Sequence, residues 1–115
     1  MVRGRVVHEL AVTESLLSQA LAEARNHGAS RITRISLLLG ESSSVVPDCV
    51  RFYFDELKHD TPARDAALEF RTVPLRIRCP RCGREFGKVE EMCACNAGGE
   101  VLSGQELVIE SIDVE

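Results

Sequence analysis

Four cysteines in two short pairs constrain this chain more than any other feature. Cys79 and Cys82 form a C-x-x-C pair, and after ten intervening residues Cys93 and Cys95 form a C-x-C pair. Two cysteine pairs joined by a loop are typical of a tetrahedral zinc site, because each pair contacts one side of the ion. The binding energy of the metal also folds a segment that has few apolar side chains. We therefore expect a zinc-ribbon-like module over residues 74–102, with all four cysteines as Zn²⁺ ligands.

Disulfide bonds and a redox C-x-x-C site are two other possible uses of these cysteines, and both are less consistent with the sequence. Residues 1–9 contain Arg3 and Arg5 but lack the long apolar core of a secretory signal, so we expect a cytoplasmic protein, in which disulfides are rare. A redox C-x-x-C site would not need a second pair. The second pair is one residue shorter than usual, which leaves open whether both of its cysteines bind the metal.

Composition limits the core and the class of partner. A chain of 115 residues suits one domain, or one domain with a small metal-bound appendage. Aromatic residues make up only 4% of the chain, so the core must rely on aliphatic side chains. The net charge of −4 argues against nucleic acid as a partner, because phosphate binding requires a basic surface. No apolar run is long enough to cross a bilayer.

Hydrophobic spacing predicts two helices. The first runs from Leu10 to a natural C-terminal glycine, Gly28, and the second begins at Pro47, which suits the first position of a helix. We interpret His27 and His59 as surface residues at the helix ends. We interpret Cys49, on the second helix, as a small, partly buried thiol without a catalytic role, since no histidine is close in sequence to act as its base.

Alternating or β-branched residues predict three strands, over residues 31–39, 66–73 and 106–115. In the last strand the apolar side changes between Ile109 and Ile112, and a bulge between them would reconcile the two halves.

The order of these elements predicts an α+β fold. We expect two helices packed on a small three-stranded, mostly antiparallel sheet, in a domain formed by residues 1–73 and 103–115. The four-cysteine module interrupts the second and third strands, which we expect to pair antiparallel.

Several short motifs also occur in a fixed order. His8-Glu9-Leu10 opens the first helix, Gly40-Glu41 follows a strand, and Ser103-Gly104-Gln105-Glu106-Leu107 leads into the last strand after the four cysteines. Together they resemble, from about residue 8 to the end, the HypA/HybF family of hydrogenase nickel-incorporation proteins.

This resemblance implies a nickel metallochaperone rather than an enzyme, which helps to load the active site of [NiFe]-hydrogenase. It implies a nickel-delivering GTPase and the hydrogenase large subunit as partners, and it leaves a homodimer open. By position, Ni²⁺ is assigned to His8 with Glu9 beside it, and structural Zn²⁺ to Cys79, Cys82, Cys93 and Cys95.

The chemistry of His8 fits this assignment. When histidine is the second residue of a chain, the terminal amine, its own amide nitrogen and imidazole Nδ1 close two fused chelate rings around one metal. The amide nitrogen of Glu9 can complete a square. Square-planar nitrogen donors suit Ni²⁺ or Cu²⁺, whereas tetrahedral thiolates suit Zn²⁺, so the two sites would discriminate by geometry.

In the printed sequence, however, His8 is the eighth residue. One hypothesis is that Val7 is a mis-called start, because a GTG codon reads as valine internally but initiates with methionine. The other is that residues 1–6 are a genuine extension, in which case nickel binds more weakly or through other donors.

The alternative function is a zinc-ribbon adaptor that binds another protein or nucleic acid. Basic residues near the cysteines favour it, namely Arg76, Arg78, Arg81, Arg84 and Lys88, whereas the acidic total disfavours it. A metallo-hydrolase is a weaker third alternative, because four thiolates close the coordination sphere of zinc and leave no open position for substrate.

Overall fold

The computed structural model describes the backbone of residues 3–115, and the side chains of residues 8–115 except that of Val89. The chain divides into two compact units. Unit 1 comprises Met1–Leu37, Val45–Phe70 and Val108–Glu115, and unit 2 comprises Leu38–Ser44 and Arg71–Leu107.

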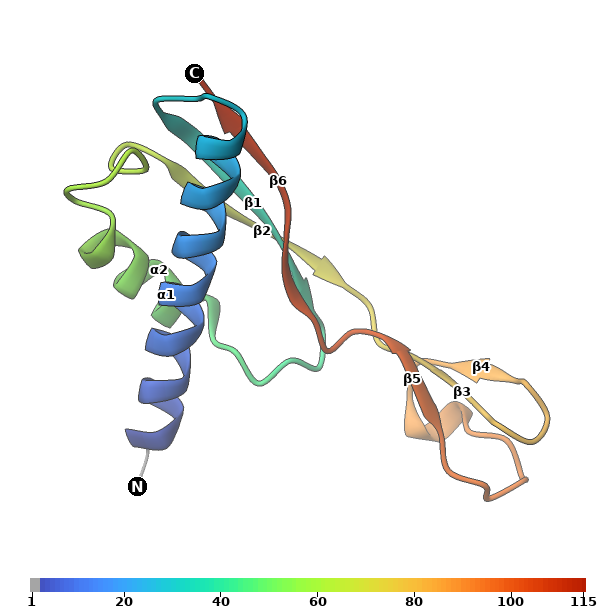
Figure 1. Cartoon of the computed structure of the whole chain (residues 1–115). Coiled ribbons are helices and arrows are strands. Elements are labelled where there is room, and N and C mark those ends of the chain that lie inside the picture. Colours follow the sequence, from blue (N-terminus) through green and yellow to red (C-terminus); the bar gives the residue numbers. More distant parts are fainter. Residues whose placement is uncertain (1–2) are drawn as a thin grey trace. The chain divides into compact units, whose positions relative to one another are not determined.

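Two helices lie in unit 1 and pack on each other: α1 (Arg3–Asn26) and α2 (Pro47–Leu57) (Figure 1). α1 begins earlier than Leu10, where the sequence analysis placed the start of the first helix. Residues 1–2 lie outside the described residues, and residues 3–9 belong to the helix. The physical reason is that no proline interrupts this stretch, and extending an existing helix costs far less than starting one.

The sheet of three strands has the order β2-β1-β6, with β1 (Ile32–Gly40) between β2 (Ala67–Val73) and β6 (Leu107–Val114). The arrows of β1 and β2 point the same way in Figure 1, as expected for strands joined through a crossover helix, here α2. β6 runs antiparallel to β1, because the Ser30 N–H donates to the Glu115 carbonyl and the Gly40 N–H to the Glu106 carbonyl.

The α+β class is therefore confirmed, and one pairing is wrong. The segments 66–73 and 106–115 were expected to pair with each other, but β1 lies between them. β1 takes the centre because it carries the most continuous apolar run, including the fully buried Ile35 and Leu37, and a central strand is covered best. In β6 the exposed Glu110 and Ser111 separate two half-buried isoleucines, as the sequence predicts, while the bulge there remains a prediction.

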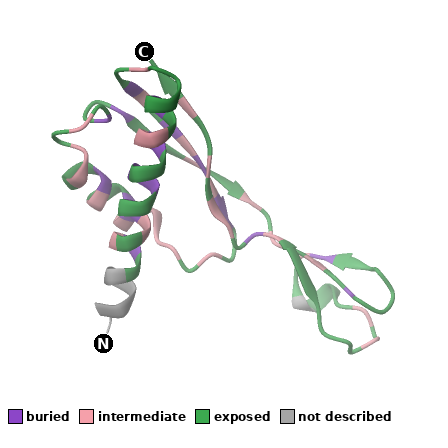
Figure 2. Cartoon of the chain, in the orientation of Figure 1, coloured by how far each residue is buried: buried purple, intermediate pink, exposed green. Residues whose placement is uncertain are grey.

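The core of unit 1 lies between the helices and one face of the sheet, where the buried residues in Figure 2 gather. Its buried hydrophobic side chains are aliphatic except for Phe54, as the low aromatic content predicts, and the polar Glu9 and Thr13 are buried with them. Its buried members include Leu16, Leu17, Ala20, Ile32, Ile35, Leu37, Val50, Phe54 and Leu68.

Unit 2 contains a second, antiparallel sheet with the order β4-β3-β5. Its strands are β3 (Arg76–Arg78), β4 (Glu85–Phe86) and β5 (Glu100–Ser103), with a short 3₁₀ helix, η1 (Val89–Glu91), between β4 and β5. The inserted four-cysteine segment is thus built on a small ribbon of its own.

In unit 2 two glycines from distant motifs pack backbone against backbone. A Cβ on Gly40 would overlap the main chain of Gly104, and Gly104 has φ +103° with its own Cβ position against Leu75. Two glutamates of the same motifs stabilise this close backbone packing through hydrogen bonds. Glu41 Oε1 accepts from the Leu75 N–H at 3.0 Å, and Glu106 Oε1 accepts from the Gly104 N–H at 2.6 Å. The motifs that contain these residues therefore have a structural role.

Among the described residues, no helix is both long enough and apolar enough to cross a bilayer.

Candidate metal centre

The first cysteine pair lies in the tight turn that joins β3 to β4. Cys79 follows β3 directly, its N–H donates to the Arg84 carbonyl at 2.8 Å, and its carbonyl accepts from the Gly83 N–H at 2.9 Å. Gly83 has φ +78°, a left-handed conformation that glycine adopts without steric cost. The turn therefore carries Cys79 and Cys82 on one short loop.

The second pair lies in the loop between η1 and β5. Asn96, directly after Cys95, has φ 52°, and Gly98 has φ +79°, so the chain turns sharply just beyond the pair. Asparagine is one of the few side chains that adopts this conformation readily. These turns direct Cys93 and Cys95 back towards the first loop.

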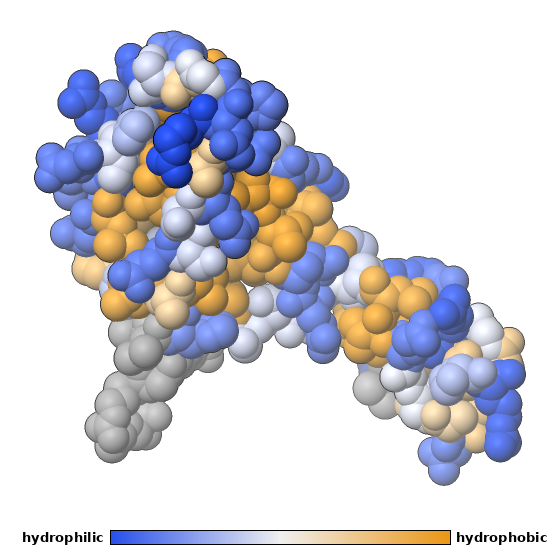
Figure 3. All heavy atoms as spheres, in the orientation of Figure 1, coloured by the Kyte–Doolittle hydropathy of each residue, from blue (hydrophilic) through white to orange (hydrophobic). Residues whose placement is uncertain are grey.

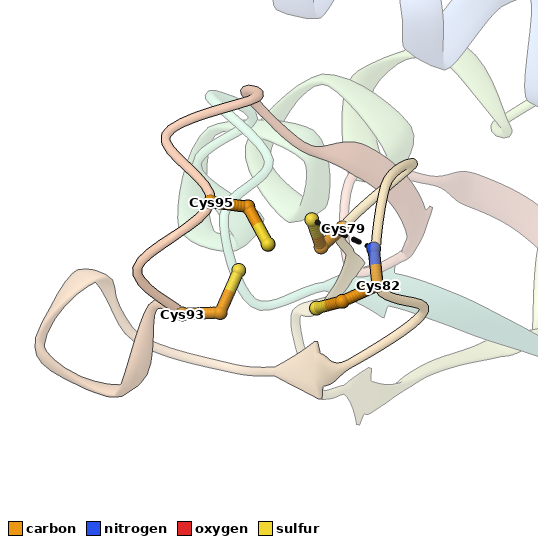
Figure 4. Close-up of side chains that lie close together, drawn as sticks. All are labelled: Cys79, Cys82, Cys93 and Cys95. Atoms are coloured by element: carbon orange, nitrogen blue, oxygen red, sulfur yellow. Dashed lines mark hydrogen bonds between the residues drawn. The ribbon is translucent and has the colours of Figure 1, made fainter.

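The four sulfur atoms converge on one point (Figure 4). All lie within 4.8 Å of one another, which is close to the sulfur–sulfur spacing of about 3.8 Å that follows from tetrahedral Zn–S bonds of about 2.3 Å. The short C-x-C pair brings both of its sulfurs into the cluster. The donor set therefore fits a metal that accepts four thiolates, and this segment is a metal-binding group.

Backbone amides prepare Cys79 to bind as a thiolate. Its side chain is only 1% exposed, and its sulfur accepts from the N–H groups of Arg81, at 3.4 Å, and Cys82, at 3.5 Å. The Cys82 N–H lowers the pKa of Cys79 most; burial opposes it, and the Arg81 N–H adds to it, so that the pKa falls to about 6.

The pKa values of the two cysteines of the second pair shift in the opposite direction. The side chain of Cys82 first, then that of Cys93, raises the pKa of Cys95 to about 12. The N–H of Cys95 lowers the pKa of Cys93, but Cys79 and burial outweigh it, so that this pKa is raised overall. Four clustered thiols thus resist complete deprotonation by themselves, and a bound cation would remove that resistance.

Two of the arginines near the cysteines are already paired inside the ribbon. Arg76 on β3 lies 2.9 Å from Glu85 on β4, and Arg78 pairs with Glu100 on β5. Their charges are therefore balanced across neighbouring strands, which weakens the sequence-based argument for a nucleic-acid surface.

His8 and Glu9 take opposite environments at the candidate nickel position. His8 is exposed, whereas Glu9 is fully buried and its Oε2 accepts from the Val46 N–H at 2.5 Å. Val46 is the N-cap residue of α2 and has no side-chain cap, so Glu9 contributes an oxygen to that helix end. The sequence analysis did not identify this role. Its only signal was the proline at position 47, which marks the helix start.

The remaining candidates lie where the sequence predicts. His27 is exposed at the end of α1 and 3.0 Å from Glu23, His59 is exposed, and Cys49 is half-buried. Within the part of the chain whose side chains are described, the four cysteines are the only cluster of metal-binding residues.

Comparison with known proteins points in one direction. A family model described as "Hydrogenase/urease nickel incorporation, metallochaperone, hypA" matches residues 7–114. A hydrogenase maturation factor HypA from Dehalococcoides mccartyi is 41% identical over an alignment of 113 residues that covers 95% of this chain and 95% of its own. The corresponding protein from Archaeoglobus fulgidus is 31% identical over 109 residues, covering 95% of this chain and 99% of its own.

Solved structures share the fold. The solution structure of the Ni metallochaperone HypA from Helicobacter pylori matches with a TM-score of 0.73 and 20% identity, over 92% of this chain and 96% of that one. Another solution structure, of a HypA protein, matches with a TM-score of 0.76 over 95% and 97% of the two chains.

Proposed function

This chain belongs to the HypA family of hydrogenase and urease nickel-incorporation metallochaperones, and we propose that it carries Ni²⁺ at the start of α1 while Zn²⁺ on four cysteines holds unit 2 folded. It is a maturation factor rather than an enzyme. We further propose a nickel-delivering GTPase and the large subunit of a [NiFe]-hydrogenase as its partners, working with it in the cytoplasm.

The observation that carries the zinc assignment is the convergence of four sulfurs within 4.8 Å. Zn²⁺ bound there would supply charge neutralisation and folding energy. Cys79, Cys82, Cys93 and Cys95 would be its ligands, and a closed set of four thiolates suits a resident ion rather than a cargo ion.

The proposed nickel position has the opposite character. Exposed His8 can be reached by a partner without opening the core, while the side chain of its neighbour Glu9 is occupied by the Val46 N–H. Glu9 would therefore serve nickel through its backbone amide nitrogen and not through its carboxylate.

Helix geometry gives a physical reason for the importance of the chain start. The first four N–H groups of a helix have no partner within the helix, whereas later ones donate to the carbonyl four residues before. In α1 (Arg3–Asn26), the amides of His8 and Glu9 lie beyond those four. In a chain that begins at residue 7, where the family match also begins, the amides of His8 and Glu9 fall among the first four N–H groups of the helix. They are then available to a metal.

The test is a nickel titration of two zinc-loaded proteins, followed by calorimetry and visible absorption. One is the chain as printed, and the other begins at position 7 with Val7→Met. Binding of one nickel by the shorter protein alone, with the absorption of a square-planar site, supports the amine and amide donors. Equal binding by both assigns nickel to internal donors. Absence of binding in both overturns the nickel proposal and favours the zinc-ribbon adaptor.

A further inference from the structure

The most exposed large apolar side chain among the described residues lies on α2. Apolar atoms reach the surface of unit 1 alongside α1, as Figure 3 shows, but Phe52 on α2 has the largest exposed fraction, 61%. Its ring contacts that of Tyr53 edge-to-face, with the ring centroids 5.4 Å apart, so the neighbouring ring helps to hold it in place. None of the proposed metal ligands lies on α2. Phe52 is therefore an apolar feature that neither the core nor the proposed metal chemistry explains.

Two carboxylates flank Phe52 on the same side of the helix. Asp48 lies one turn before it and Glu56 one turn after it, and both are exposed. Successive residues of a helix are rotated by about 100°, so these three residues lie opposite Val50 and Phe54, which are the buried residues of α2. A rise of about 1.5 Å per residue separates the two acidic residues by about 12 Å along the axis. We call this acidic–apolar–acidic row the outer face of α2.

The basic side chains of α2 are engaged elsewhere. Arg51 donates to the Leu68 carbonyl and lies 4.8 Å from the ring centroid of Phe70. Lys58, the C-cap residue, lies 3.4 Å from Asp55. Within the part of the chain whose side chains are described, neither carboxylate of the outer face forms an ion pair or a hydrogen bond. The two carboxylates of the outer face are therefore available to a cation from outside the chain.

Glu56 is also unfavourable for the helix that carries it. It lies in the last turn of α2, which contains no basic residue. The C-terminus of a helix carries partial negative charge, so a carboxylate there costs helix stability. A carboxylate that its own helix disfavours, one turn from an exposed aromatic ring, is explained by a cationic partner and not by the fold.

The same charges exclude two other occupants. Two copies of α2 packed antiparallel would place Asp48 of each copy opposite Glu56 of the other, and like charges across an interface are destabilising. An extended segment would find no sheet edge here, since the backbone groups of α2 are bonded within the helix. A basic helix complements the outer face instead, because its residues repeat with the same spacing.

We propose that the outer face of α2 is a docking site for an amphipathic helix of another protein, with two arginines eight positions apart and an apolar residue midway between them. The arginines pair with Asp48 and Glu56, and the apolar residue packs on the ring of Phe52. A guanidinium can also stack on that ring, as Arg51 does on Phe70.

The location of this face gives the docking site a use. The Val46 N–H, at the N-cap of α2, donates to Glu9, which directly follows the proposed nickel donor His8. A partner on α2 is therefore held close to the proposed nickel position. Docking itself requires no nickel, so this proposal stands or fails independently of the nickel assignment.

The first experiment maps a model helix onto the full, zinc-loaded chain without nickel. The probe is a capped, alanine-rich peptide of about 16 residues with two arginines eight positions apart and a leucine midway, added while amide NMR shifts are recorded. We expect saturable shifts confined to α2. A peptide of the same composition with its arginines on opposite faces should bind at least tenfold more weakly. Equal binding of the two peptides, saturable shifts confined to other elements, or no saturable binding would overturn the proposal.

Protein variants test the same face from the other side. Phe52→Ala should weaken peptide binding by on the order of tenfold. Glu56→Gln should weaken it by about two- to fivefold, as for an exposed ion pair, whereas Glu14→Gln, which removes an exposed carboxylate from α1, should leave it unchanged. Equal effects of the two glutamine substitutions would show attraction to net charge alone and overturn the proposal.

Stability measurements separate docking from a structural role. Chemical denaturation of Glu56→Gln should show stability equal to or above that of the parent chain, because the substitution removes negative charge from a helix C-terminus. A loss of stability would assign Glu56 to the fold and overturn its role in docking. A dimer in light scattering whose α2 amides broaden with concentration would identify a second copy as the occupant and overturn the proposal as well.

Discussion

The buried carboxylate of Glu9 accepts a hydrogen bond from the Val46 amide, 2.5 Å away, and so links α1 to the first turn of α2. The residue before it, His8, is exposed. Two consecutive residues on a helix point about 100° apart, so one can belong to the core while the other faces a partner. The His-Glu motif thus combines a candidate metal donor with a residue that positions the helix bearing it.

Glu9→Ala should destabilise unit 1 by about 1–3 kcal/mol, because the part-buried Val46 N–H loses its acceptor. Glu9→Gln keeps an oxygen acceptor and should cost less. Chemical denaturation of the zinc-loaded proteins measures both. Equal stability of Glu9→Ala and the parent chain would show that the Val46 amide finds water instead.

Nickel binding should depend on the imidazole of His8 and be insensitive to the side chain of Glu9. In the protein that begins at residue 7, His8→Ala should abolish nickel binding by calorimetry, since the Nδ1 donor closes a chelate ring. His27→Ala is the matched control, because His27 is also exposed on α1 but pairs with Glu23. Similar losses from both substitutions would contradict the proposed site.

Removal of zinc should unfold unit 2 and spare unit 1. The ribbon strands β3 and β4 are only three and two residues long, so they depend on the metal, whereas unit 1 has its own aliphatic core. Amide NMR after chelation should show collapse of the signals of unit 2 alone. Cys95→Ser should weaken zinc binding by more than about a hundredfold, beyond the cost of losing an outer-shell partner, while Cys49→Ser should not change it.

The sequence predicted those parts of the molecule that depend on local pattern. Hydrophobic spacing predicted the two helices. The spacing of the four cysteines predicted that they cluster, because a metal site requires a fixed number of donors. The strand order was not predictable in this way, since β2 and β6 alternate similarly and nothing local shows that β1 would lie between them. Burial of Glu9 escaped prediction as well, because its partner is a backbone amide 37 positions away, a group that every residue but proline carries.

Gly104→Ala should destabilise unit 2 more than a single strained residue can explain. At φ +103° an L-residue is strained by about 1–3 kcal/mol, and the added Cβ would also overlap the main chain at Leu75. Gly28→Ala is the matched control, since Gly28 has φ +68° but no atom within 4 Å of its Cβ position, so only strain applies. Chemical denaturation of the zinc-loaded variants, followed through signals from each unit, should show the larger loss for Gly104→Ala and confine it to unit 2. If the two substitutions cost the same, the close packing of Gly40, Gly104 and Leu75 contributes nothing beyond backbone conformation, and the glycines of these two motifs would need another explanation.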